Sequence, residues 1–171
     1  MTTPQLFFAY FAVAIIGMSV LVVTRRNPVH SVLWMLVLFV HIAALYLFLN
    51  AEFLAAIQII IYAGAILVLF LFVIMLLNLR KEEIEIKFQK QWPVGMGIGI
   101  VFIIFFVLII GKITVIPPPG EYTVKFVQSE GSIMTIGKVL YTEYLLPFEI
   151  ASLILLVAII GAVVLAKKKI S

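Results

Sequence analysis

The sequence predicts an all-α integral membrane protein with five transmembrane helices. Of its 171 residues, 65% are hydrophobic and only 12% are charged, and the mean hydropathy is +1.28, far outside the range of soluble domains. The apolar residues also gather into five long runs, each long enough to cross the ~30 Å hydrocarbon layer as a helix. A soluble fold would expose much of this surface to water, so we expect a bilayer around the chain.

Five apolar runs define the predicted helices, which we place in a single membrane domain over residues 1–171. The runs cover residues 5–23, 29–49, 53–79, 94–116 and 147–166. No basic segment precedes the first run, which favours a retained span over a cleaved signal. Only residues 50–52 separate the second and third spans, so these two helices must be adjacent and antiparallel. The long connection, residues 112–146, has room for a short amphipathic stretch over residues 131–144.

The third span is longer than one straight crossing requires. Residues 53–79 would reach about 40 Å at 1.5 Å per residue, against a hydrocarbon layer of ~30 Å. We therefore expect this helix to tilt, to bend or to project into the aqueous layer.

Positive charge predicts the side that each loop faces, because Lys and Arg concentrate on the cytoplasmic side. Nine of the twelve basic residues fall on one side and the other three on the opposite side. The nine are Arg25, Arg26, Arg80, Lys81, Lys87, Lys90, Lys167, Lys168 and Lys169, and the three are Lys112, Lys125 and Lys138. We expect the N-terminus and the long loop to lie outside, and the C-terminus to lie in the cytoplasm.

Composition argues against several kinds of site. The sequence contains no cysteine, which excludes disulfides, thiolate metal sites and cysteine-ligated iron–sulfur clusters. The net charge of +4 sits at helix ends, as is typical of membrane flanks, and does not indicate nucleic acid. His30 and His41 stand 11 residues apart on one helix, about 16 Å, and cannot share a haem. We expect no complete active site within this chain.

Few polar side chains lie at membrane depth, where such groups are costly and commonly functional. Gln58 and Tyr62 are four residues apart, so a regular α-helix would place them on one face. His41 lies near the middle of the second span, and Glu52 and Glu149 lie near the outer boundary. Each has a structural explanation too: an interhelical hydrogen bond for His41, packing for Tyr62, and hydration at the interface for the carboxylates.

Ala63, Gly64 and Ala65 form a run of small residues near the middle of the third span. Small residues let another backbone approach closely, which is their ordinary use in membrane bundles. Gly64 would also lower the cost of a local distortion such as a π-bulge. The residues alone leave both explanations open.

The third span and its flanks closely resemble the NuoJ-type subunit of respiratory complex I, the equivalent of the mitochondrial sixth ND subunit. Three blocks carry the resemblance: Glu52-Phe53-Leu54 through Gln58 to Tyr62-Ala63-Gly64-Ala65 and on to Leu79, then Asn27-Pro28-Val29-His30-Ser31, and Tyr144-Leu145-Leu146-Pro147-Phe148-Glu149. In that family the third helix carries a π-bulge, here over Tyr62–Val68, that can convert to regular α-helix and open or close a water path.

The resemblance implies a membrane-arm subunit of a proton-translocating NADH:quinone oxidoreductase in the bacterial cell membrane. It implies partners of the NuoA, NuoK, NuoH and NuoN types, which with other subunits bind NADH, FMN, the iron–sulfur clusters and quinone, and carry most proton-carrying carboxylates. Other members can have an acidic residue where this chain has Gln58. The implied gate comprises Tyr62, Gly64, Ala65, Val68 and Gln58, and a candidate polar relay comprises Glu52, His41 and Glu149.

Two other functions stay open. A small transporter or channel working alone would be expected to contain inverted repeats or interrupted helices with polar, substrate-facing groups, and no convincing repeat is present. A purely structural membrane scaffold would share every packing feature with the gate.

Overall fold

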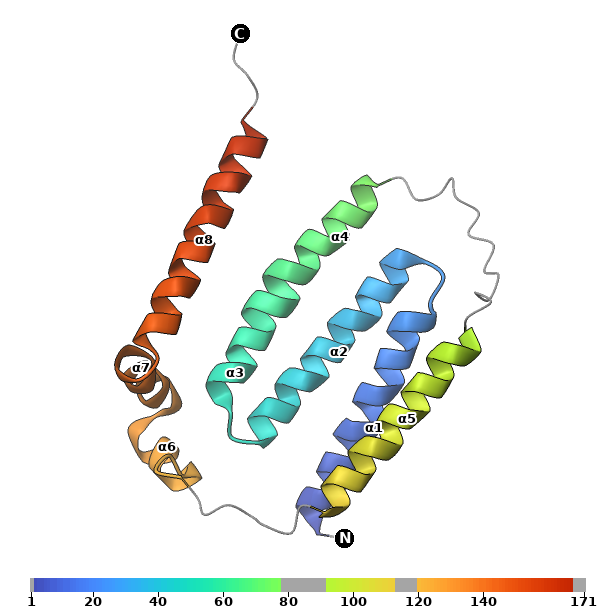
Figure 1. Ribbon diagram of the computed structural model, residues 1–171, viewed down its shortest axis with the longest axis horizontal. Coiled ribbons are helices and arrows are strands. Elements are labelled where there is room, and N and C mark those ends of the chain that lie inside the picture. Colours follow the sequence, from blue (N-terminus) through green and yellow to red (C-terminus); the bar gives the residue numbers. More distant parts are fainter. Residues whose placement is uncertain (1, 78–91, 113–119, 168–171) are drawn as a thin grey trace.

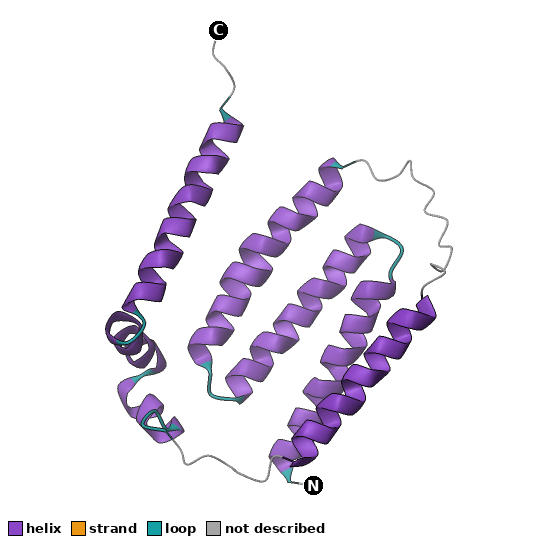
Figure 2. Cartoon of the chain, viewed as in Figure 1, coloured by secondary structure: helices purple, strands orange, loops and turns teal. Residues whose placement is uncertain are grey.

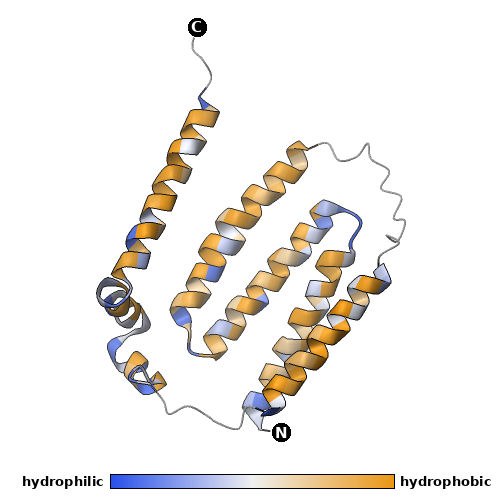
Figure 3. Ribbon diagram, viewed as in Figure 1, coloured by the Kyte–Doolittle hydropathy of each residue, from blue (hydrophilic) through white to orange (hydrophobic). Residues whose placement is uncertain are grey.

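The computed structural model describes residues 2–77, 92–112 and 120–167. Every regular element within these residues is a helix (Figures 1 and 2), and five helices are long and apolar enough to cross a membrane. These five are Thr3–Thr24, Pro28–Phe48, Glu52–Leu76, Trp92–Lys112 and Leu145–Ala166. The prediction of an all-α protein with five transmembrane-length helices is confirmed. Figure 3 shows hydrophobic residues along all five and polar residues mainly at their ends and connections.

Helices α1 (Thr3–Thr24) and α2 (Pro28–Phe48) form a tight hairpin. Asn27 caps the start of α2, because its side chain accepts a hydrogen bond from the Val29 N–H. Pro28 is the first residue of the helix, where a missing N–H costs nothing. The Ser31 hydroxyl donates to the carbonyl oxygen of Val22 across the turn. These contacts close the hairpin, and the two helices then pack along their length.

The third span is divided into three segments: α3 (Glu52–Ile57), a π-helix η1 (Gln58–Ile66) and α4 (Leu67–Leu76). Asn50 permits the short turn before α3 because it adopts a left-handed conformation with φ +59°, which asparagine tolerates better than most residues. All three segments pack against α2, as the three-residue connection requires. Residues 78 and 79, the end of the predicted span, lie outside the described residues.

Two short helices follow in the long connection: α6 (Val124–Glu130) and α7 (Ser132–Thr142), joined at Gly131 with φ +88°. Helix α7 forms within the stretch where we expected an amphipathic segment. It contacts α6, the start of the third span and α8 (Leu145–Ala166). The Gln128 side chain donates to the Asn50 side chain at 3.2 Å, which joins α6 to the turn between α2 and α3.

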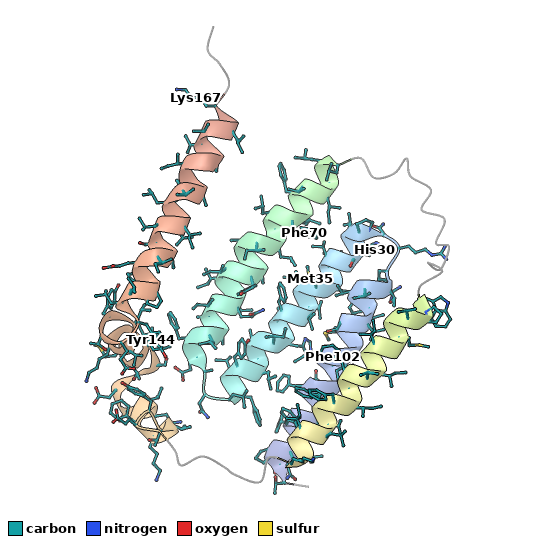
Figure 4. All side chains as sticks on the ribbon, viewed as in Figure 1. His30, Met35, Phe70, Phe102, Tyr144 and Lys167 are labelled. Atoms are coloured by element: carbon teal, nitrogen blue, oxygen red, sulfur yellow. The ribbon has the colours of Figure 1, made fainter. Side chains whose placement is uncertain are left out.

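The buried core is small and lies where α2 meets the third span. Its apolar members are Val32, Ala43, Ala55, Ala63 and Leu67. By contrast, α1, α5 (Trp92–Lys112) and α8 contain no buried residue, and α5 packs extensively against no other described helix. Side chains such as Phe102, which is 71% exposed, project freely from α5 (Figure 4). These apolar faces require lipid or other polypeptides around them.

Candidate functional site in the third membrane span

The third span changes its hydrogen-bonding pattern in the middle of its length. Within η1, backbone bonds join residues five apart, and the last of them runs from the Leu67 N–H to the Tyr62 carbonyl. Most π-helical segments are single turns within α-helices and are frequent at functional sites. The family resemblance implied a π-bulge over residues 62–68, whereas the structure has a π-helical segment over residues 58–66. The segment thus begins four residues earlier and includes Gln58.

The π-helix decides which side chains of the third span face α2. The buried positions are Ala55, Gln58, Ala63 and Leu67, so the interval between Gln58 and Ala63 is five residues. In a regular α-helix, five residues would place Ala63 about 140° around the axis from Gln58. The wider π turn returns Ala63 to the buried face, and Leu67 follows it.

Gln58 and Tyr62 occupy different environments within this segment. Gln58 is only 7% exposed, whereas Tyr62 is 46% exposed, with its ring against Phe39 of α2 at 5.9 Å. Within the described part of the chain, neither the Gln58 amide nor the Tyr62 hydroxyl has a hydrogen-bond partner, and because no fully buried side-chain nitrogen or oxygen there lacks one, both groups reach the surface of the chain. An unsatisfied polar group in an apolar environment costs roughly 1–3 kcal/mol, so these groups require a partner from water or from another polypeptide.

Sequence reasoning did not single out Phe39, although a signal for it exists. Phe39 and Tyr62 lie at equal distances along the chain from the turn between Asn50 and Ala51. In an antiparallel helical hairpin, residues that mirror each other about the turn lie at the same height. This symmetry indicates the pair once the short connection is recognised.

A Cβ added at Gly64 would lie 3.2 Å from the carbonyl oxygen of Ile59, five residues earlier, a tighter contact than most side chains make. At Gly99 or Gly161 a Cβ would meet no atom within 4 Å beyond the neighbouring turn of its own helix. The gate candidates Gly64, Ala65 and Val68 are all exposed. They therefore face lipid or another polypeptide rather than α2.

His41 faces α1 rather than the third span. Its Nδ1 lies 2.9 Å from the Val37 carbonyl oxygen, which can only accept, so Nδ1 donates this hydrogen bond. Nε2 forms a hydrogen bond with the Tyr10 hydroxyl of α1, 3.4 Å away. The structure thus places His41 in the interhelical hydrogen bond considered from the sequence.

The other members of the candidate polar relay lie apart from His41. Glu52 is the first residue of α3 and is exposed, and Glu149 is exposed on α8. No hydrogen bond or ion pair of the described residues joins Glu52, Glu149 and His41. The isolated chain does not bring these three groups together.

The five long apolar helices, the exposed faces and the interrupted third span define a multi-pass membrane protein built to pack among lipid or other polypeptides. Residues 18–165 match the family model described as NADH-ubiquinone/plastoquinone oxidoreductase chain 6. The chain belongs to this family, which confirms the resemblance to the complex I subunit.

Individual relatives agree over nearly the whole chain. NAD(P)H-quinone oxidoreductase chain 6 of Leptolyngbya boryana is 41% identical, over 95% of this chain and 79% of the relative. NADH-quinone oxidoreductase subunit J of Rickettsia prowazekii is 40% identical, over 96% of this chain and 80% of the relative. The chloroplastic NAD(P)H-quinone oxidoreductase subunit 6 of Staurastrum punctulatum is 38% identical, over 99% and 92%.

Proposed function

We propose that this chain is a membrane-arm subunit of a proton-translocating NADH:quinone oxidoreductase, and that its third span couples quinone reduction to proton pumping. NADH, FMN, the iron–sulfur clusters and quinone are bound by other subunits, and this chain contributes no complete active site. The π-helical segment Gln58–Ile66 is the observation that carries the proposal. A span that combines α-helical and π-helical segments can convert between two arrangements, and a coupling step needs an element of this kind.

The coupling motion is a conversion of η1 to regular α-helix. Losing the extra residue of the π turn rotates the helix beyond it by one residue, about 100°. Tyr62 and Ile66 then replace Ala63 and Leu67 on the face that packs against α2. The rotation moves the Tyr62 hydroxyl from its present position to the face of the helix that carries the unpaired Gln58 amide. The set of polar groups that water can reach along the span therefore changes.

The ends of the third span favour rotation of α4 rather than of α3. Helix α3 is held on one side by α7 and by the hydrogen bond between Gln128 and Asn50 beside its first turn. Among the described elements outside the third span, α4 packs extensively only on α2. The conversion of η1 therefore rotates α4, together with the surface that α4 presents to lipid or to neighbouring subunits.

The exposed apolar helices of the chain are completed by neighbouring subunits of the NuoA, NuoK, NuoH and NuoN types in the bacterial cell membrane. Gln58 is an amide and cannot carry a proton as a carboxylate does, so proton-carrying groups lie mainly on these partners. The charge distribution supports an external N-terminus and a cytoplasmic C-terminus.

Gly64 provides the sharpest test of the switching helix. In Gly64→Ala the new methyl group meets the Ile59 carbonyl oxygen of the π register, and alanine also favours α-helix by ~1 kcal/mol. We expect normal assembly and quinone reduction but fewer protons moved per NADH, with Gly64→Val more severe. Gly99→Ala has the same propensity gain without the steric contact, and is expected to pump normally.

The same experiment separates the gate from a structural scaffold. A scaffold requires only that the subunits assemble, so Gly64→Ala and Gly99→Ala would behave alike. Full coupling in the assembled Gly64→Val complex would refute the switching helix.

A further inference from the structure

A groove of about 790 Å³ lies between the start of the third span and the segment formed by α6 and α7. Its wall on α7 is largely apolar, with Ile133, Met134, Gly137 and Tyr141. Its charged residues are Glu52 at the start of α3, Glu130 at the end of α6, and Lys138 on α7.

The groove is level with the ends of two membrane spans. Glu52 is the first residue of the third span, and Leu145, the first residue of α8, follows α7 after two intervening residues. In Figure 1, α7 is seen nearly end-on while α8 lies in the plane of the view, so α7 runs across the axis of α8. If α8 crosses the bilayer, α7 lies along its surface, where headgroups meet acyl chains.

Helix α7 turns apolar side chains outward at this level. Ile133, Met134 and Tyr141 are 70%, 66% and 61% exposed. Thr135 instead faces inward: it is 7% exposed, and its hydroxyl donates to the Gly131 carbonyl oxygen at 3.0 Å. Ile136, Val139 and Leu140 are half-buried on the inward side as well, so α7 has apolar side chains on both sides, whereas a surface helix facing water would have a polar outer face. An apolar ligand is therefore needed over this face of α7.

The charges of the groove indicate the chemistry of that ligand. Within the described residues, Glu52, Glu130 and Lys138 form no ion pair. Two carboxylates and one ammonium give a net negative groove, which disfavours a purely anionic headgroup. A headgroup with both an ammonium and a phosphate matches it, because the carboxylates attract the ammonium and Lys138 attracts the phosphate.

We propose that this groove binds one zwitterionic aminophospholipid. Its phosphate lies at Lys138, its ammonium lies at Glu130 and Glu52, and one acyl chain covers Ile133, Met134 and Tyr141. The bound lipid fills the space between α7 and the third span, so it joins the outer segment to the end of that span. The site requires only the membrane setting and is independent of the switching helix.

Photolabelling of the whole complex tests the site. The complex is placed in nanodiscs of phosphatidylcholine with a trace of phosphatidylethanolamine that carries a diazirine in its acyl chain. We expect label on the α7 peptide that contains Met134 and Tyr141, measured by mass spectrometry relative to label on α5. Glu130→Gln and Lys138→Gln should each reduce this ratio by roughly five- to tenfold, because each loses one charge-assisted contact.

Matched variants control for charge and for assembly. Glu121→Gln and Lys125→Gln remove exposed charges from the same outer segment but outside the groove, and should label as the unaltered complex does. Lys138→Arg should retain label. The proposal is overturned if phosphatidylglycerol labels α7 as strongly as phosphatidylethanolamine does, if all four charge-removing variants label equally, or if a neighbouring subunit covers α7 and excludes both lipids.

Discussion

The ring of Tyr62, in the π-helical segment, meets the ring of Phe39 on α2 edge to face, with centroids 5.9 Å apart and planes inclined at 77°. This is a favourable geometry for an aromatic pair. It joins the irregular part of the third span to a regular neighbour. The rotation proposed above would move the Tyr62 ring about 100° around the helix axis, so we expect it to change this edge-to-face geometry and the pair to favour the π register.

Removal of the aromatic ring at Phe39 should favour the regular α-helix. Such pairs contribute ~0.5–1.5 kcal/mol beyond their buried area, so Phe39→Leu should shift the balance of registers by roughly two- to thirteenfold and lower the protons pumped per NADH. Phe48→Leu is the control, because Phe48 pairs with Phe7 and Phe11 of α1. Equal effects of both substitutions on the pumping ratio would show that the Tyr62 pair has no special role.

The Gln58 amide should matter for coupling rather than for stability. Because it has no hydrogen-bond partner within the described chain, Gln58→Leu should leave assembly unchanged or improve it, by up to ~1–3 kcal/mol if no other group satisfies the amide. We expect the same variant to lower the pumping ratio, measured in proteoliposomes with a pH-sensitive dye. Unimpaired pumping by Gln58→Leu would place the amide outside the water path.

His41 and Tyr10 should behave as a packing pair between α1 and α2. A hydrogen bond between membrane helices contributes on average ~0.6 kcal/mol. Tyr10→Phe and His41→Leu should therefore be non-additive by about this amount in the thermal stability of the complex. His41→Gln should pump normally, because it faces α1. Loss of pumping in this variant, despite normal assembly, would instead support a place for His41 in the polar relay.

The absence of cysteine from the sequence allows the orientation to be measured directly. A single cysteine at Lys125→Cys should react with a membrane-impermeant maleimide added outside intact cells. One at Arg25→Cys should react only after permeabilisation, and one at Gly99→Cys, within α5, should react in neither case. The reverse pattern for the first two variants would invert the predicted topology.

Much of the architecture follows from the sequence because partition into lipid depends on local composition. Five helices are predicted from the five apolar runs and from the helix-start residues Asn27 and Pro28. The three-residue connection at residues 50–52 predicts that α2 and the third span are adjacent. The pairing of Phe39 with Tyr62 also follows from this adjacency, because the two residues lie at equal distances from the short turn. Each inference rests on residues that are close in the chain.

The tertiary structure alone decides how the third span is wound and what its polar groups meet. A π-helical segment is rare compared with regular α-helix, and composition alone does not predict one. Its presence goes with the packing against α2 that buries Gln58, Ala63 and Leu67 together. The same holds for the hydrogen bond between His41 and Tyr10 and for the outward apolar face of α7. These depend on neighbours distant in the chain, which local composition does not specify.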